Sequence, residues 1–377
     1  MTGMRDVAAK AGVALSTVSL VVNGTGYVSR SAREKVLAAM KELDYVPNEL
    51  ARNLHRNRTD LIGVIVPTIR HPFFATLTAA IQNRLADRGL RTLLCSTTDA
   101  EQGEAEYVDM LRRRMMDGIV VASHTDHDVA YWTSIGRPVV AFDRVLGQGI
   151  PTVASDHEQG GNLVADLLLG SGARHVVMVG GPRRQFPDAP GVPTSYPTVR
   201  YHMTLEERLR KAGVRYDYLE AGEVWDLDGY RTAVTRAFDA TPGMDALVSS
   251  DIGAALAVQE AFRRGVAVPR DLQIVAYDGT YLSDLSGMHL TAVRQDFAGL
   301  AALIATRLQE RIDAGDSKDS GAGRRRGSSA SGMPGRRIAP AARGIPPLTG
   351  VPIDTVPVRL RIGDSTCAPA GGRSDCD

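Results

Sequence analysis

The sequence predicts an α/β protein with a small helical module at its N-terminus. From residue 61 onward, short apolar runs rich in β-branched residues alternate with amphipathic helical patterns, which is typical of parallel α/β layering. About 230 residues of such units exceed what one sheet of ordinary size needs. Residues 1–60 contain short helical patterns and no strand pattern. We therefore expect a helical module followed by two α/β subdomains that face each other across a cleft.

Composition and charge narrow the class of protein. The 377 residues are 44% hydrophobic, which is enough for sizeable cores and excludes disorder throughout. The net charge of +1 gives no overall field that attracts DNA or a membrane, whereas residues 1–60 alone carry +3. The sequence contains no apolar run of membrane-spanning length and begins without a signal-peptide pattern, so we expect a cytoplasmic protein and no membrane partner.

The first 46 residues have the pattern of a helix-turn-helix. Two short helical segments, 6–11 and 15–23, are separated by Gly12. An advance of 100° per residue places one face of the second helix opposite its valines, and this face consists of Ser16, Ser19, Leu20 and Asn23. A third helix is expected to begin near Ser31, which has capping-box spacing to Glu34, and to close the core with Val36, Leu37, Met40 and Leu43.

The strand pattern of the core is apolar and short. The expected strands are residues 61–66, 92–95, 118–122, 138–142, 175–179, 246–250 and 272–276. Between them lie helical stripes such as Phe74, Leu77, Ile81 and Leu85. Ligands of such folds bind at the carboxyl ends of the strands, so we expect the site there.

Three segments depart from the α/β pattern. Residues 182–198 contain five prolines and predict a long loop or lid. Residues 316–350 are rich in Gly, Ser, Pro and Arg and predict a disordered insert, with a basic arm that touches DNA as the alternative. Residues 367–377 predict a disordered tail.

The sequence gives little support for a catalytic site or a metal site. His124 and His127 flank Asp126 without a third ligand, and the three cysteines have no ligand neighbours at short spacing. Nucleotide-binding and hydrolase motifs are missing where strand-to-helix turns would require them. We expect neither an enzyme nor a bound metal or cofactor.

An ordered series of motifs resembles the lactose/galactose repressor (LacI/GalR) family. In residues 1–60 it comprises Asp6-Val7-Ala8, Ala11-Gly12-Val13, Ser16-Thr17-Val18-Ser19, Val22-Asn23-Gly24, Val28-Ser29, Arg33-Glu34-Lys35-Val36 and Tyr45-Val46-Pro47-Asn48. In the core it continues through Leu61-Ile62-Gly63-Val64, Pro72-Phe73-Phe74, Asp117-Gly118-Ile119-Val120, Ser250-Asp251, Ala276-Tyr277-Asp278, Leu290-Thr291 and Gln295-Asp296. The resemblance covers nearly the whole chain except the two inserts. It implies a DNA-binding domain at 1–46, a hinge helix and linker at 47–60, and a periplasmic-binding-protein-like core at 61–366.

The resemblance also implies DNA contacts. Bases would be read by Leu15, Ser16 and Leu20, where leucines offer apolar contact and many members have an arginine at the position of Leu20. Phosphates would be bound by Thr17, Ser19, Asn23 and Tyr45, although the alternative for each is a polar residue on a solvated face. Ala14 replaces the usual capping serine. In the hinge, Asn48 belongs to the motif, and Ala51 and Leu54 match the positions that face the partner subunit and the DNA.

In the cleft, the resemblance implies a small-molecule effector. Phe73 would stack on a ring, and Asp156 and Asp278 would bind hydroxyls, with helix capping as the alternative for either aspartate. Trp225 lies near an aromatic position of the family, unless Val224 occupies it. Ser250 replaces the usual asparagine, and Tyr201, with Arg200 beside it, stands where the family has a ligand-binding arginine. A sugar is the leading expectation; purine-like and phosphorylated ligands stay open.

The resulting hypothesis is a homodimeric DNA-binding regulator, and the resemblance implies that it acts as a repressor. A two-fold axis would match a near-palindromic operator, and the effector would change operator affinity. The alternatives are a solute-binding receptor without a DNA function and, third, an enzyme on the same scaffold.

Overall fold

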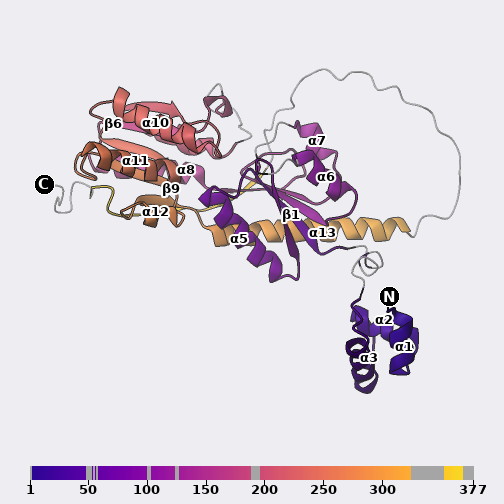
Figure 1. Ribbon diagram of the computed structural model, residues 1–377. Coiled ribbons are helices and arrows are strands. Elements are labelled where there is room, and N and C mark those ends of the chain that lie inside the picture. The colour runs from indigo at the N-terminus through magenta and orange to yellow at the C-terminus, as the bar shows by residue number, and fades with distance from the viewer. Residues whose placement is uncertain are drawn as a thin grey trace, which may run out of the picture. The chain divides into compact units, whose positions relative to one another are not determined.

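The chain forms two compact units in a computed structural model (Figure 1). The structure describes residues 2–47, 53, 56, 58–99, 103–123, 127–187, 196–323 and 352–367, with side chains only up to residue 315 in the last helix. The units are Met1–Thr59 and Asp60–Asp377. Each has its own hydrophobic core.

The N-terminal unit is a three-helix module that contains the predicted helix-turn-helix. Its helices are α1 (Met4–Ala11), α2 (Leu15–Asn23) and α3 (Arg30–Glu42). Gly12 ends α1 in the left-handed conformation, at φ 63°, which lets the chain turn sharply into α2. The core consists of Val7, Ala8, Ala11, Val18, Val21, Val36 and Ala39.

Two details predicted for the third helix are wrong. Ser29, not Ser31, caps α3: its side chain accepts a hydrogen bond from the amide of Ala32 at 3.3 Å. Leu37 is 50% exposed, because it lies about 100° around the helix from the buried Val36, and Ala39 takes its place in the core. The missing cap of α2 is confirmed, since Ala14 precedes it without a side-chain hydrogen bond.

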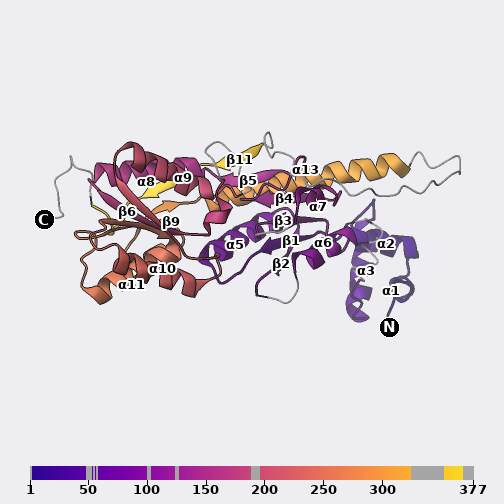
Figure 2. The same cartoon turned by 90° about the horizontal axis from the view of Figure 1, so that it is seen from above.

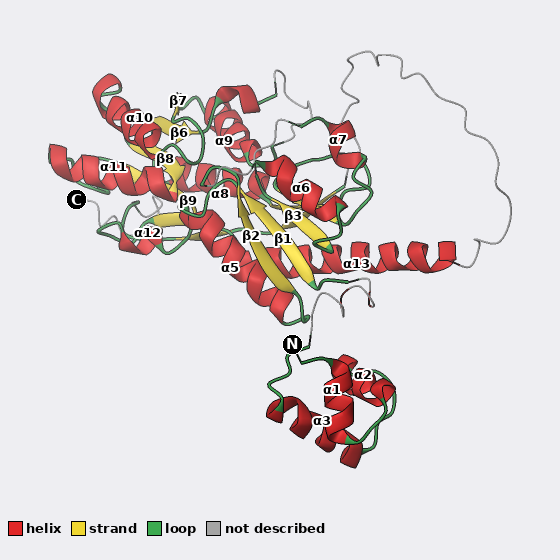
Figure 3. Cartoon of the chain, turned by 45° about the vertical axis from the view of Figure 1, so that its right-hand side comes forward, coloured by secondary structure: helices red, strands yellow, loops and turns green. Residues whose placement is uncertain are grey.

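The second unit contains two six-stranded sheets. The first sheet is wholly parallel, in the order β11-β5-β4-β3-β1-β2. Its strands are β1 (Leu61–Val66), β2 (Arg91–Ser96), β3 (Gly118–Val121), β4 (Val139–Phe142), β5 (Thr152–Ser155) and β11 (Ile353–Val356). Helices α5 (Pro72–Ala86) and α13 (Phe297–Gly323) cover one face, and α6 (Glu104–Arg112) and α7 (Val129–Thr133) the other (Figure 3). We call this layer the first subdomain.

The second sheet has the order β12-β10-β9-β8-β6-β7, with only β12 antiparallel to its neighbour. Its strands are β6 (His175–Gly180), β7 (Arg215–Glu220), β8 (Ala246–Ser250), β9 (Gln273–Asp278), β10 (Thr291–Arg294) and β12 (Arg359–Arg361). Helices α8 (His157–Gly170) and α9 (Val199–Lys211) cover one face, and α10 (Leu227–Ala240) and α11 (Asp251–Arg264) the other (Figure 2). The short α12 (Leu282–Leu285) precedes β10. This layer is the second subdomain.

The chain passes between the subdomains three times. The first crossover joins β5 to α8, the second joins β10 to α13, and the third joins β11 to β12. All seven predicted strands are present, but β5, β7, β10, β11 and β12 were not predicted. These strands are short, or carry polar residues at a sheet edge, so they lack the apolar run that marks a buried parallel strand.

The inserts are only partly described. The Pro-rich segment begins with a single 3-10 turn, η1 (Arg183–Gln185). The backbone of α13 continues to Gly323, which is eight residues into the segment for which disorder is predicted. Residues 188–195, 324–351 and 368–377, and hence the other predictions for the inserts and the tail, lie outside the described residues. Of the described helices, none alone has the length and apolarity of a membrane span; α1 and α2 pass that test only as a pair bent by 110°.

Candidate functional site

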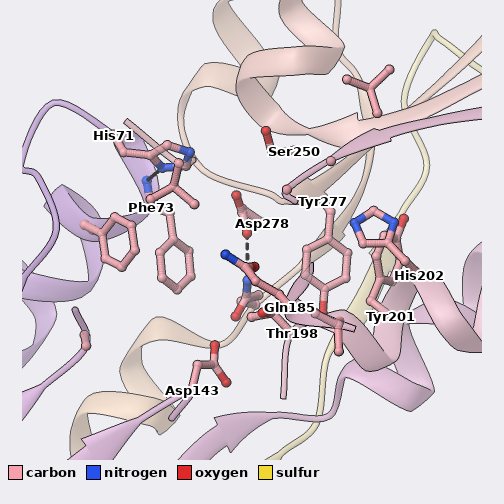
Figure 4. Close-up of a pocket in the computed structure, with 18 of the residues that line it drawn as sticks. His71, Phe73, Asp143, Gln185, Thr198, Tyr201, His202, Ser250, Tyr277 and Asp278 are labelled. Atoms are coloured by element: carbon pink, nitrogen blue, oxygen red, sulfur yellow. Dashed lines mark hydrogen bonds between the residues drawn. The ribbon is translucent and has the colours of Figure 1, made fainter. Parts of the chain in front are cut away.

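A cavity of about 140 Å³ lies between the two subdomains, at the carboxyl ends of their strands. The first subdomain contributes the start of α5 and the ends of β3 and β4. The second contributes the ends of β6, β8 and β9, together with α9 (Figure 4). The cavity lies where the sequence predicts the site, because parallel strands leave such a crevice where they end.

Aromatic rings form much of the cavity wall. Phe73 stacks on Phe142 with ring centroids 5.8 Å apart. On the opposite side, the ring of Tyr201 lies 3.9 Å from that of Tyr277. Flat apolar faces of this kind suit a ring-shaped ligand, and polar groups must then fix its orientation.

Two aspartates provide the orienting groups, one from each subdomain. Asp143 follows β4 and Asp278 ends β9, and both have positive φ, at 46° and 115°. Gln295 Nε2 donates to Asp278 Oδ1 at 2.7 Å. Burial, followed by the nearby Asp251 carboxylate, holds the pKa of Asp278 well above its usual range. Backbone strain and a perturbed carboxyl in one cavity are typical of a functional site.

Four polar atoms at the cavity are buried and have no hydrogen-bond partner in the part of the chain that is described: Asp143 Oδ2, the Tyr201 hydroxyl, His202 Nδ1 and Ser250 Oγ. Leaving such a group unpaired costs about 1 to 3 kcal/mol. Burial lowers the pKa of His202 to about 3, helped by Arg183 and His157, so its ring is neutral at pH 7. A ligand that carries hydroxyl groups would satisfy these atoms.

Arg144 is a buried cation at the same cavity. Its Nε donates to the Ser123 carbonyl at 3.1 Å, and Nη1 donates to the Asp143 carbonyl. The guanidinium also lies 4.6 Å from the centroid of the Tyr196 ring. Burial lowers the pKa of Arg144 to about 10, which keeps it charged at pH 7. These contacts hold the loop after β4 in place and with it Asp143.

The structure brings together four of the predicted effector residues and leaves three apart. Phe73, Tyr201, Ser250 and Asp278 line the cavity. Asp156, Arg200 and Trp225 are not among its lining residues.

Each of those three has a physical reason to be elsewhere. Asp156 accepts a hydrogen bond from the Gln159 amide at 2.9 Å and caps α8, which is the alternative role considered for it. Arg200 is exposed on the first turn of α9, next to the buried Tyr201. Trp225 is 41% exposed, and its neighbour Val224 lines the cavity instead.

Sequence reasoning missed Asp143, His202 and Gln295. Asp143 directly follows the predicted strand 138–142, so its position at a strand end was an available signal. His202 and Gln295 have no comparable signal, because α9 and the second crossover reach the cavity only through the tertiary fold.

The second candidate site is the surface of α2. Leu15 is 43% exposed and Ser16 is exposed, as base contacts require. Asn23 Nδ2 donates to Ser19 Oγ at 3.1 Å, which orders both side chains on that surface.

The other predicted DNA contacts in this unit are less exposed. Leu20 is partly buried and lies near Gly26, whereas Thr17 is half-buried and Tyr45 packs against the three-helix core. Asn48, Ala51 and Leu54 lie outside the described residues, as does His124. Within the described part of the chain, no group of three or more His, Cys, Asp or Glu side chains has an arrangement that would hold a metal ion.

Two family models match both parts of the chain. Residues 3–48 match the family model for bacterial regulatory proteins of the lacI family, and residues 59–293 match that for periplasmic binding proteins and the sugar-binding domain of the LacI family. The chain is 34% identical over 311 residues to the sucrose operon repressor of Pediococcus pentosaceus, covering 82% of this chain and 92% of that protein. It is 32% identical over 297 residues to the ribose operon repressor of Bacillus subtilis, covering 78% and 87%.

Solved structures agree on the fold. A lac repressor dimer bound to operator and the anti-inducer ONPF has a TM-score of 0.73 and 22% identity, covering 97% of this chain and 99% of that one. A complex of the transcriptional regulator CelR with cellobiose has a TM-score of 0.60 and 24% identity, covering 97% and 100%. Together with the helix-turn-helix and the cavity between two parallel sheets, these matches establish that the chain belongs to the LacI family of bacterial transcriptional regulators.

Proposed function

We propose that this protein is a cytoplasmic transcriptional repressor that binds a near-palindromic operator as a homodimer and whose operator affinity is set by a sugar in the cavity. One observation carries the proposal: the chain that bears the helix-turn-helix also bears a cavity between two subdomains with unpaired polar atoms, among them Asp143 Oδ2 and the Tyr201 hydroxyl. The repressors of sucrose and ribose operons among the relatives support a sugar.

The chemistry of the cavity favours a single sugar ring. A cavity of about 150 Å³ in another protein accommodates benzene, and the cavity here is of similar size, about 140 Å³. The rings of Phe73 and Phe142 would lie against an apolar sugar face, while Asp143 and Asp278 would accept hydrogen bonds from hydroxyls. A purine-like or phosphorylated ligand is the competing outcome, and a ligand screen separates the three.

On the DNA side, we assign direct readout to α2. Leu15 and Leu20 would contact thymine methyl groups, and Ser16 would bond a base edge. Thr17, Ser19, Asn23 and Tyr45 would bind phosphates and fix the register. In the hinge segment, Asn48, Ala51 and Leu54 would contact the minor groove and the partner subunit, with Leu54 inserted between base steps.

The test is a titration of a palindromic duplex from the protein's own promoter region, at several salt concentrations and with a panel of sugars, purines and sugar phosphates. A regulator gives a log–log salt slope near −0.9 for each phosphate it neutralises. Leu15→Ala should weaken operator binding and leave sugar binding intact. Asp278→Asn should weaken sugar binding and leave operator binding by the ligand-free protein intact. Salt-independent or absent duplex binding would leave the solute-binding receptor as the better description.

A further inference from the structure

Each ligand-facing aspartate is hydrogen-bonded to a residue at a crossover between the subdomains. Asp278, of the second subdomain, accepts from Gln295 on the second crossover; Gln295 Oε1 in turn accepts from Ser155 Oγ at the end of β5, at 2.5 Å. Asp143, of the first subdomain, is bonded to His157, the first residue of α8 on the first crossover. Both carboxylates are therefore tied to the opposite subdomain.

His157 makes the more direct of these two connections. Its side chain is 1% exposed, and both ring nitrogens are used. Nε2 lies 2.9 Å from Asp143 Oδ1, and Nδ1 is hydrogen-bonded to the hydroxyl of Tyr277 on β9. One imidazole thus joins the end of β4 in the first sheet to β9 in the second.

The three groups restrict the directions of the hydrogen bonds. A carboxylate only accepts, so the Nε2–H of His157 donates to Asp143, and with a single proton on the ring Nδ1 accepts from the Tyr277 hydroxyl. A buried chain of this kind is polarised along its length, and a change at one end alters the bond at the other.

The hydrogen-bonded chain begins at a cavity-lining carboxylate that has one unpaired oxygen. Asp143 Oδ2 has no partner among the described residues, although Oδ1 of the same carboxylate is bonded to His157. A ligand hydroxyl that donates to Oδ2 would withdraw charge from Oδ1 and weaken its bond to His157. At the other end, the Tyr277 ring packs against Tyr201, whose hydroxyl faces the same cavity without a partner.

We propose that His157 is the positioning residue that transmits occupancy of the cavity to the angle between the subdomains, through the chain Asp143–His157–Tyr277. The inference rests on the proposed function only in taking the ligand to be a sugar. The hydrogen bonds of Asp143, His157 and Tyr277 do not depend on that function. Ligand binding at Asp143 changes the His157 bonds, and the first crossover changes its conformation in response.

The hydrogen bonds of Asp143, His157 and Tyr277 are tested first, in the protein without any ligand. In the full-length protein with ¹⁵N-labelled histidine, His157 should give the signals of a ring protonated at Nε2 and hydrogen-bonded at an unprotonated Nδ1. Tyr277→Phe should shift the Nδ1 signal and Asp143→Asn the Nε2 signal. A His157 signal that neither substitution moves would overturn the proposal.

A second experiment measures how strongly sugar binding changes the affinity for the operator. Coupling of this kind typically changes affinity about 5- to 150-fold. In His157→Phe, the sugar should still bind, as measured by calorimetry, but the change that it causes in operator affinity should fall below about twofold, against that coupling range in the unsubstituted protein. His157→Gln, which keeps a donor and an acceptor, should restore part of the response.

Ser249→Ala is the matched control. It also deletes a buried hydrogen bond, from Ser249 Oγ to the Val179 carbonyl at 2.8 Å, but this bond lies within the second subdomain, so the sugar response should stay complete. A full response in His157→Phe would overturn the proposal. If His157→Phe does not fold, His157→Gln and Tyr277→Phe are compared instead. If the unsubstituted protein binds no sugar, the proposed function fails. The ¹⁵N signals of His157 in the ligand-free protein then decide by themselves whether the hydrogen bonds Asp143–His157–Tyr277 exist.

Discussion

The ring of Tyr201 packs on the ring of Tyr277 at a centroid distance of 3.9 Å, while the Tyr201 hydroxyl has no hydrogen-bond partner among the described residues. Burial raises the pKa of both phenols, so both are neutral. Resemblance to the family places a ligand-binding arginine at this position. A neutral ring with one unpaired hydroxyl binds a different pattern of ligand groups than a guanidinium with five donors.

Removing the Tyr201 hydroxyl should affect the stability of the protein and its affinity for the sugar in different ways. In Tyr201→Phe, the free energy of unfolding should stay constant or rise by about 1 kcal/mol, because a buried unpaired group is lost. Sugar affinity should fall about tenfold, because the ligand loses a partner worth roughly 1 kcal/mol or slightly more. Chemical denaturation and calorimetry measure the two effects. A variant that loses stability but keeps its affinity would assign the hydroxyl to the fold.

Asp278 predicts a pH-dependent ligand affinity. Its pKa is held well above the usual range by burial and by Asp251. A proton on the carboxyl removes an acceptor for sugar hydroxyls, so the sugar Kd should rise as the pH falls, by up to about tenfold per pH unit below the pKa. Asp278→Asn should bind more weakly and lose most of this dependence. Calorimetry between pH 5.5 and 8 checks both; an unchanged pH profile in the variant would contradict the assignment.

His71 predicts a pH-dependent stability. Its Nδ1 accepts from the Phe73 amide at 3.3 Å at the start of α5, which requires a neutral ring, and burial lowers its pKa from 6.5 to about 4. Between these two values the unfolded chain binds a proton that the folded chain does not. The free energy of unfolding therefore falls as the pH drops from 6.5 toward 4, by about 1.4 kcal/mol per pH unit.

His71→Asn isolates this term, because asparagine caps a helix but does not titrate. Denaturation of both proteins at pH 7.5 and pH 5.0 should find that the stability of the original protein relative to the variant decreases by about 2 kcal/mol at the lower pH. A difference that is the same at both pH values would mean that the pKa of His71 is the same in the folded and the unfolded chain, and would contradict the prediction.

Ala14 predicts a stabilising substitution in the DNA-binding unit. It precedes α2 in an extended conformation, at φ −67° and ψ 150°, and offers no side-chain acceptor. Ala14→Ser should stabilise the N-terminal unit by about 1 kcal/mol, measured on its unfolding transition in the full-length chain. Ala9→Ser, at an exposed position inside α1, is the control and should give no gain. An equal effect of both serines would argue against capping.

The amino-acid sequence by itself determined the helix-turn-helix and seven of the described strands, in their order along the chain. Periodicity located α2 and the seven apolar strands, since burial on one helix face or on both sheet faces leaves a local pattern. The resemblance to the family placed Phe73 and Asp278 at the site, and Asp278 lies at the end of a predicted strand. It misplaced Asp156 because a strand-terminal aspartate and a helix cap have the same sequence signature.

Only the tertiary structure decided which side chains meet. Asp143, His157 and Tyr277 come from β4, α8 and β9, and up to 134 residues of chain separate them along the sequence. No local pattern records that one imidazole bonds to both others, because the contact depends on how two sheets pack around the crossovers. The unpaired atoms at the cavity are likewise a property of packing, since only burial makes an unpaired polar group costly.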